Sequence, residues 1–171
     1  NRLSKELDNS NVLSLAVTVN SYSRKSIIKA KSAFIRLVNG KTKKEMGRFV
    51  LNQTKDWIGL LLGLFERNRQ TGGWFFRVMV DPLEGNTVKE SYPSLKTLLN
   101  GYTESFNSGV VNYQPRHPLP NEPVLTPETW IDMNPGLTYI GLGWDILPGN
   151  IYDLDASIVS FDRNINLLEI S

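Results

Sequence analysis

Three aspartates near the C-terminal end of the chain are spaced in a way that could bind a cation. Asp153 and Asp155 lie two residues apart in the strand-like run YDLDASIVSF, and Asp145 lies just upstream in GLGWD. Side chains of a strand alternate between its two faces, so Asp153 and Asp155 are expected on one face, roughly 6–7 Å apart. Two carboxylates at this distance repel each other, so either both are solvated or a cation lies between them.

The segments that must position these aspartates have the alternating pattern of antiparallel strands. NVLSLAVTV alternates apolar and small polar residues, and KSAFIRLVNGK ends at Asn39-Gly40, a dipeptide typical of tight hairpin turns with positive φ. MGRFVLNQ would return as the hairpin partner, and DWIGLLLGLFERN is apolar on both faces, as in a strand buried on both sides. The one plausible helix is YPSLKTLLNGY, with Ser94 as its N-cap and Gly101 at its end. We therefore predict an all-β fold, an antiparallel β-sandwich with at most one or two short helices.

Composition excludes several classes of site. The chain has no cysteine, which excludes disulfides, thiolate metal sites and a cysteine nucleophile. The longest apolar run, from Trp57 to Phe65, is too short to cross a bilayer, so no membrane span is expected. A single histidine, His117, makes neither a zinc site nor a nucleophile–base pair. No constellation for catalysis is present, and we expect a protein without enzymatic activity.

Charge is distributed unevenly along the chain. Residues 1–100 carry 17 Lys/Arg against 8 Asp/Glu, whereas residues 101–171 carry 2 against 9. Such a division is compatible with a nucleic-acid face or with two parts that attract each other. The basic clusters SRKSIIKAK and GKTKKE are short and follow strand ends, which favours solvated loops over contact with a polyanion. Nucleic acid is therefore not an expected partner.

A change of composition divides the chain. Six of the nine prolines lie between Pro115 and Pro135, where strand periodicity is lost. Proline lacks the N–H that a sheet needs, so residues 106–135 are predicted to form an extended proline-rich linker, with one possible helical turn at LTPETW. Residues 1–105 and 136–171 are the two strand-rich segments. The absence of an initiator Met and of a turn after NLLEIS suggests a piece of a longer chain.

Two sets of motifs resemble the TerD domain of tellurium-resistance and general-stress proteins. GLGWD followed by YDLDAS resembles the opening half of that domain, and LAVTVNSYS, AFIRLVNG, GRFVL and GGWFFRVMV resemble its closing half. The closing half occupies residues 1–105 and comes first, so the order of the halves is reversed. The glycine- and acid-rich loop that usually joins the halves is absent. The chain could span the end of one repeat and the start of the next, be a circular permutant that forms one sandwich, or lack its acidic loop. We favour the tandem-repeat segment, in which other parts of a longer chain or a partner would cover the apolar face that each half leaves open.

The resemblance implies a calcium site. TerD relatives bind Ca²⁺, and the matching positions here are Asp145, Asp153 and Asp155. Ca²⁺ takes 6–8 oxygen ligands, so three carboxylates at one sheet edge would leave its shell incomplete without the missing loop. Leu154, Ala156 and Ile158 would face the core and anchor the strand. Asp162 and Asn164 are either additional ligands or part of a hairpin turn.

The resemblance also implies a function. We expect a Ca²⁺-binding, non-enzymatic TerD-type module, cytoplasmic, that acts as an interaction domain in stress or tellurite-resistance assemblies. Its expected partner is another protein or a neighbouring TerD repeat. One alternative is a purely structural segment of a large complex, in which Asp153 and Asp155 are solvated and bind no ion. Binding of a small anionic ligand such as a cyclic nucleotide is a further alternative, which no residue here singles out.

Overall fold

The computed structural model describes residues 12, 14–51, 56–67, 73–107, 129–133, 138–145, 152–162 and 164–170. In chain order its strands are β1 (Ser14–Ser21), β2 (Lys31–Asn39), β3 (Glu45–Val50), β4 (Gly59–Arg67), β5 (Trp74–Leu83), β6 (Trp130–Met133), β7 (Thr138–Asp145), β8 (Leu154–Phe161) and β9 (Leu167–Ile170). A 3₁₀ turn, η1 (Ile27–Lys29), precedes β2, and the helix α2 (Val88–Asn107) follows β5. The chain is mostly β, as its alternating patterns predict.

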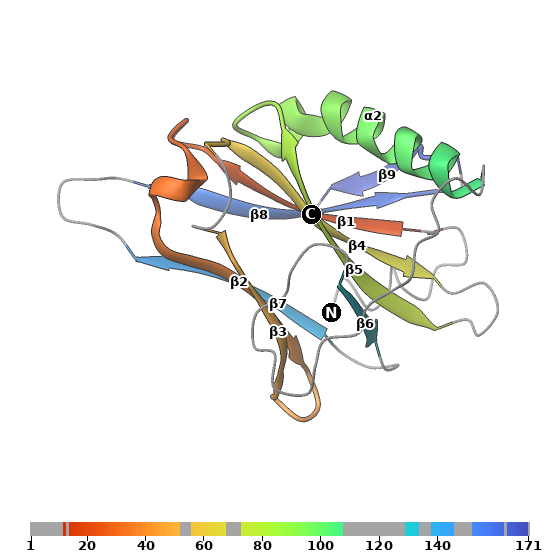
Figure 1. The fold of residues 1–171 in the computed structure, drawn as a ribbon, viewed down its shortest axis with the longest axis horizontal. Coiled ribbons are helices and arrows are strands. Elements are labelled where there is room, and N and C mark those ends of the chain that lie inside the picture. The colour runs from red at the N-terminus through yellow and green to blue at the C-terminus, as the bar shows by residue number, and fades with distance from the viewer. Residues whose placement is uncertain are drawn as a thin grey trace.

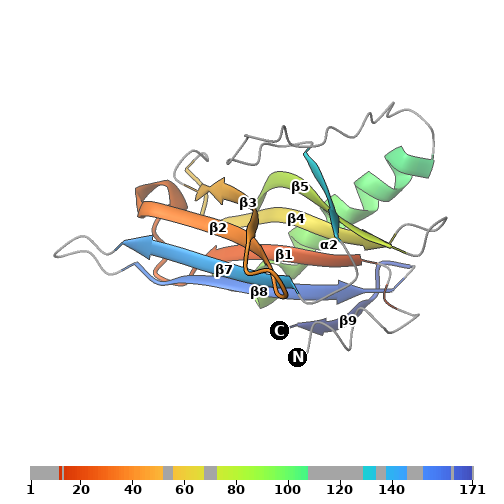
Figure 2. The same ribbon diagram turned by 90° about the horizontal axis from the view of Figure 1, so that it is seen from below.

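The strands form two sheets that pack face to face. One has six strands in the order β6-β5-β4-β1-β8-β9, and the other has three in the order β3-β2-β7. The strand pairs are antiparallel. Helix α2 lies on the face of the six-stranded sheet that points away from the three-stranded sheet (Figures 1 and 2). The prediction of an antiparallel β-sandwich is confirmed, and α2 adds a third layer.

Strands from the two ends of the sequence lie side by side in both sheets. Strand β1 pairs with β8 from Ser14 opposite Phe161 to Ser21 opposite Leu154. In the smaller sheet, β2 pairs with β7. Both sheets therefore combine strands of the 1–105 segment with strands of the 136–171 segment, and the described residues of the two segments share one core.

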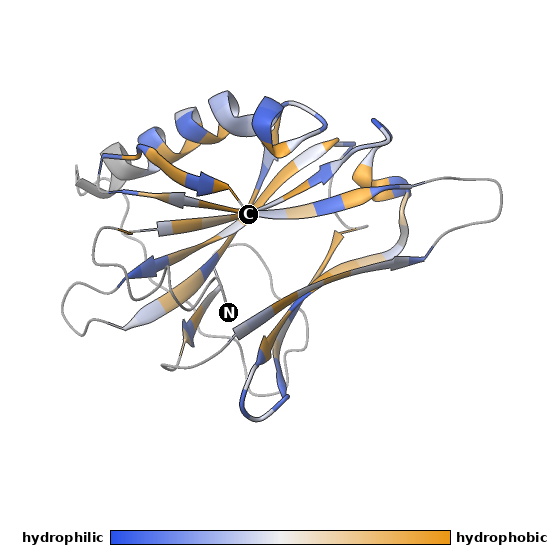
Figure 3. Cartoon of the chain, turned by 180° about the vertical axis from the view of Figure 1, so that it is seen from behind, coloured by the Kyte–Doolittle hydropathy of each residue, from blue (hydrophilic) through white to orange (hydrophobic). Residues whose placement is uncertain are grey.

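That core lies between the two sheets. Alternate residues of β1 (Leu15, Val17 and Val19) and of β2 (Ala33, Ile35 and Leu37) are at most 1% exposed and belong to one apolar cluster. Ile140, Leu142 and Trp144 of β7 pack against the same cluster. Figure 3 shows apolar residues along the strands of both sheets, whereas the β2–β3 loop is hydrophilic. Period-two patterning thus places one side of each strand in the core.

Strand β4 is buried on both faces, as its continuous apolar sequence predicts. Leu60 and Leu62 face the inter-sheet core, whereas Leu61 and Leu64 pack in a second cluster with residues of α2. The register against β5 shifts between Leu61 and Gly63, where a bulge interrupts the alternation. The need to cover this second apolar face explains why an all-β sequence carries one long helix.

Helix α2 is longer than the predicted segment at residues 92–102. It begins at Val88, after Thr87, whose hydroxyl accepts a hydrogen bond from the Glu90 amide at 3.3 Å. Glu90 in turn accepts one from the amide of Asn86 at 3.0 Å, which closely matches a capping box. The helix continues through Gly101 to Asn107, so the predictions of a Ser94 cap and a Gly101 end were wrong. The Thr-x-x-Glu pattern of TVKE is the sequence signal that marks the start of this helix.

The β2–β3 hairpin also differs from the expected tight turn. Positive φ occurs at Lys43 (59°), whereas Gly40 does not have it. Asn39 organises the loop because its side-chain oxygen accepts the amides of Lys41 and Thr42, both at 2.9 Å. The Asn39-Gly40 dipeptide therefore marks the turn correctly, but its role is a longer loop held by an Asx motif.

Most of the predicted linker, including His117, lies outside the described residues. Within 106–135, α2 extends to Asn107, and Trp130–Met133 forms β6, which pairs with β5 at the edge of the large sheet. That part of the linker is thus a strand. Among the described residues, no helix is long and apolar enough to cross a membrane.

Candidate functional site

The two aspartates of the DLD motif lie on one side of their strand, as predicted. Asp153 and Asp155 are exposed, whereas Tyr152 and Leu154 are 7% and 4% exposed. Leu154 and Ile158 contact the inter-sheet core and anchor the start of β8. The main chain of Asp153 is fixed as well, because its carbonyl accepts the Tyr22 amide at 2.9 Å.

Asp145 lies in the other sheet. It ends β7, pairs in register with Lys31 and is exposed, next to the inward-packing Trp144. By alternation, Asp145 points away from the core on the three-stranded side, whereas Asp155 points away on the six-stranded side. Strand β7 ends and β8 begins at the same end of the sandwich (Figure 1). The three aspartates therefore share one end of the molecule but not one sheet edge.

The expected convergence of three carboxylates is not found in the described part of the chain. Within those residues no group of three or more His, Cys, Asp or Glu side chains could hold a metal ion. The physical reason is that consecutive strands β7 and β8 belong to different layers, a fact that alternation within each strand cannot reveal. The assignment of Asp145, Asp153 and Asp155 as metal ligands remains a prediction.

A buried amide lies beside Asp155. Asn20 of β1 is the register partner of Asp155 and is 1% exposed. Its Nδ2 donates to Ser91 Oγ at 2.7 Å and to the Gly85 carbonyl at 3.1 Å, while its Oδ1 is buried without a hydrogen-bond partner. A buried acceptor without a donor costs free energy, so an additional cationic or hydrogen-bonding group would stabilise this position. Carboxylate and amide oxygens are ligands that suit Ca²⁺, but Asp153, Asp155 and Asn20 alone offer too few for its full shell.

A basic side chain lies near the DLD motif. Lys25 Nζ lies 5.1 Å from the ring centroid of Tyr152, which is next to Asp153 in sequence. Nearby cations weaken the attraction of carboxylates for a divalent ion. Lys25 therefore adds positive charge close to the DLD motif.

Asp162 and Asn164 form a turn. The Asp162 carboxylate accepts the amides of Asn164 and Asn166, both at 2.8 Å, and the Asn166 side chain at 3.0 Å. These hydrogen bonds lower the pKa of Asp162, the Asn166 side chain being the largest cause. Of the two interpretations of FDRN, the hairpin turn is the one that the structure supports.

The sequence analysis missed a polar cluster under the C-terminal half of α2. Arg77 of β5 is 5% exposed and forms an ion pair with Glu66 of β4 at 2.9 Å. Its guanidinium lies 5.6 Å from the Tyr102 ring, and the Tyr102 hydroxyl donates to Asp81 at 2.6 Å. Burial raises the pKa of Glu66, although Arg77 opposes this. A lone arginine within GGWFFRVMVD was the available signal, and the cluster's visible role is to fasten α2 to the sheet.

The fold defines a two-sheet antiparallel sandwich with a helix on the outer face of its larger sheet. Over 85 residues the chain is 31% identical to tellurium resistance protein TerZ of Serratia marcescens, which covers 50% of this chain and 42% of that protein. This is distant homology, and the chain spans less than half the length of that relative. No family model and no solved structure matches the chain.

Proposed function

We propose that this chain is a non-enzymatic binding module of the TerD type that acts in stress or tellurite-resistance assemblies. The observation that carries the proposal is the 85-residue similarity to a tellurium resistance protein. The strand pairing supports it, because the GLGWD and DLDAS segments complete both sheets started by residues 14–50. A circular permutant that forms one sandwich is the arrangement that this pairing favours over two separate repeats.

We further propose that Ca²⁺ binds at the end of the sandwich where β7 ends and β8 begins. Asp153 and Asp155 would be the principal ligands, and the unpaired Asn20 Oδ1 marks the side of β8 on which the ion would lie. Asp145 is the third candidate ligand, although it points away from the core on the three-stranded side. Bound Ca²⁺ would neutralise the repulsion between the two carboxylates and order this end for a protein partner.

Calorimetric titration with Ca²⁺ tests the metal proposal. We expect weak binding that is lost in Asp153→Asn and Asp155→Asn and retained in Asp132→Asn, which removes an exposed carboxylate from β6. Asp145→Asn tests whether the carboxylate on the three-stranded sheet contributes to Ca²⁺ binding. Unchanged binding would restrict the site to the aspartates at β8. Absence of heat in the unsubstituted protein would favour the structural alternative, in which Asp153 and Asp155 are solvated.

A further inference from the structure

The outer face of the three-stranded sheet carries basic and aromatic side chains. Because Ala33, Ile35 and Leu37 are buried in the core, the intervening Phe34, Arg36 and Val38 point outward. Helix α2 covers the six-stranded sheet, and no described helix or strand covers this face (Figures 1 and 2). We call the outward side chains of β2 and β3 together with the β2–β3 loop the β2–β3 face (Phe34, Arg36, Lys41, Lys43, Lys44, Arg48).

Two glycines of β7 let side chains of β2 lie flat on this face. A Cβ at Gly143 would be 2.8 Å from Phe34 Cζ, closer than real Cβ contacts allow. A Cβ at Gly141 would be 3.4 Å from Arg36 Nε. The space that Gly141 and Gly143 leave is occupied by Phe34 and Arg36. The result is a flat surface across β2 and β7.

Cations on this face are held in place by aromatic rings. Arg48 Cζ lies 4.1 Å from the Phe34 ring centroid, and Lys43 Nζ lies 4.6 Å from that of Tyr139. Arg48 is also held by Glu45 through two nitrogens, at 2.9 and 2.8 Å. Such contacts reduce the side-chain entropy that a cation loses on binding an anion. They also place a cation over each ring, which leaves less ring surface for stacking with nucleic-acid bases.

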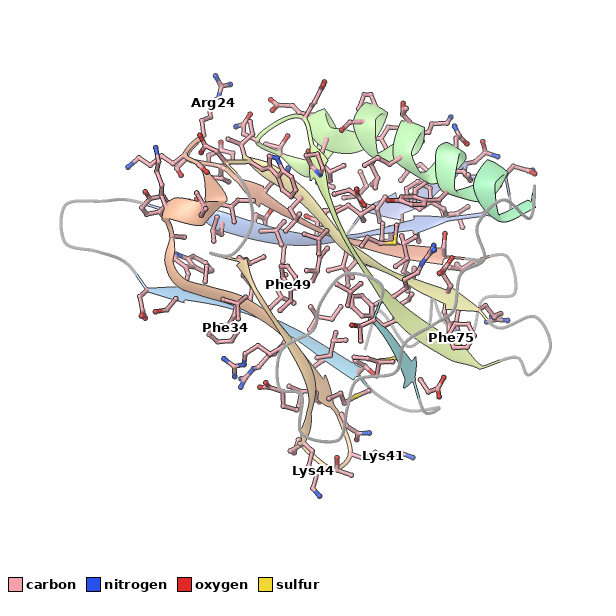
Figure 4. The ribbon with its side chains drawn as sticks, in the orientation of Figure 1. Arg24, Phe34, Lys41, Lys44, Phe49 and Phe75 are labelled. Atoms are coloured by element: carbon pink, nitrogen blue, oxygen red, sulfur yellow. The ribbon has the colours of Figure 1, made fainter. Side chains whose placement is uncertain are left out.

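The tertiary structure joins two basic clusters that the sequence keeps apart. Residues 22–50 contain nine of the 19 Lys/Arg residues and one acidic residue, Glu45. The 23–31 and 40–45 clusters lie at opposite ends of β2, with Arg36 between them. Figure 4 shows Arg24 near one end and Lys41 and Lys44 at the other, with Phe34 between. Nine strand residues span about 30 Å, so the positive charge follows a line of that length.

We propose that the β2–β3 face binds an extended, acidic segment of a partner protein. A line of cations about 30 Å long matches roughly nine residues of extended chain, and guanidinium groups pair with carboxylates through two parallel hydrogen bonds. Because cations already lie over the rings of Phe34 and Tyr139, these rings are less available for base stacking. The face therefore favours a carboxylate-rich peptide over single-stranded nucleic acid. This proposal goes beyond the calcium site, because none of these residues belongs to that site.

Fluorescence anisotropy with a labelled peptide of about twelve alternating Glu and Ser residues tests the proposal, at about 50 mM salt with EDTA present. We expect saturable binding that weakens with salt and is absent for the matching Gln-Ser peptide. Arg36→Glu and the double substitution Lys41→Glu/Lys44→Glu should each weaken it about tenfold, or about 1.4 kcal/mol. The control Lys89→Glu/Lys96→Glu on α2 changes the net charge by the same amount as Lys41→Glu/Lys44→Glu. It should leave peptide binding unchanged.

The controls separate folding from binding. The hairpin lysines are exposed, so the double substitution should leave the thermal transition unchanged even if Arg36→Glu disturbs the sheet. Equal loss in the α2 variant would mean that net charge alone attracts the peptide, which overturns the proposal, as does failure of the acidic peptide to bind. Tighter binding of a thymidine oligonucleotide of similar length, with the same variants affected, would identify a nucleic-acid site instead. EDTA keeps these outcomes independent of the calcium site.

Discussion

At the scale of residues, glycines and buried charges have roles that depend on their neighbours. Gly63 of β4 is paired with β5, where a Cβ would meet the Arg77 carbonyl at 2.3 Å and Phe76 Cζ at 2.6 Å. Gly101 of α2 has no atom within 4 Å of its would-be Cβ. The same residue type is therefore required by packing in the first case and is a weak point of a helix in the second.

Gly63→Ala and Gly101→Ala should change stability in opposite directions. The first introduces a clash with backbone and a buried ring, and we expect a loss of about 1–3 kcal/mol in the free energy of unfolding. The second replaces a poor helix former at an open position and should add about 0.5–1 kcal/mol. Urea denaturation followed by circular dichroism measures both. A destabilising Gly101→Ala would mean that the helix does not continue through this residue in solution.

The Glu66–Arg77 pair should make stability depend on pH. Because burial raises the pKa of Glu66 above its ordinary value of 4.5, the folded state binds a proton more readily than the unfolded state. The contribution of Glu66 to stability is therefore fully present below pH 4.5 and decreases as pH rises toward the folded pKa. Relative to Glu66→Gln, the unsubstituted protein should lose stability over this interval in pH-dependent thermal unfolding. The opposite slope would show that the ion pair with Arg77 outweighs burial.

At the scale of elements, α2 exists because the six-stranded sheet has a second apolar face. Leu95 and Leu99 of α2 are 0% and 4% exposed and pack with Leu61 and Leu64 of β4. The Thr87–Glu90 cap starts the helix, and the Tyr102–Asp81 hydrogen bond fastens its later part. Helix and sheet thus stabilise each other.

Leu95→Ala should destabilise the protein by about 2–5 kcal/mol, because it removes a fully buried side chain between helix and sheet. Thr97→Ala is the matched control on the exposed side of the same helix, where only a hydroxyl bond to the Pro93 carbonyl is lost. Thermal unfolding monitored by near- and far-ultraviolet circular dichroism measures both. Equal small effects of the two substitutions would contradict the docking of α2 on β4.

At the scale of the whole molecule, the two strand-rich segments depend on each other. Strand β1 lies between β4 and β8, and β2 lies between β3 and β7. Without residues 136–171, one side of each of these two central strands would lose its hydrogen-bonding partner. Exposed strand edges of this kind are prone to aggregation.

A chain ending at residue 135 should therefore not fold cooperatively by itself. Adding the separate 136–171 segment should restore a cooperative thermal transition, because β7 and β8 supply the missing partners of β2 and β1. Circular dichroism and size-exclusion chromatography would follow both steps. A stable, monomeric 1–135 fragment with an unchanged transition would show that the segments are separate domains.

Much of the fold could be predicted from local patterns. Alternation in LSLAVTV, the two apolar faces of GLLLGLF and the outward position of Asp153 and Asp155 all follow from a period of two residues. The boundaries of α2 agree less well with the prediction, because the Thr87–Glu90 cap marks its start and Gly101 lies inside the helix. These are errors in weighing local signals.

The position of the aspartates relative to one another depends on the tertiary structure. Periodicity tells which side of its own strand a residue occupies, but not which sheet the strand joins. Asp145 and Asp155 lie ten residues apart in sequence and on opposite outer sides of the sandwich, because β7 pairs with β2 while β8 pairs with β1. Likewise, the basic clusters before and after β2 lie at the two ends of one strand, which the extended backbone of β2 keeps apart. The sequence alone thus determines strands, faces and charge, whereas pairing between residues more than a hundred positions apart determines which side chains meet.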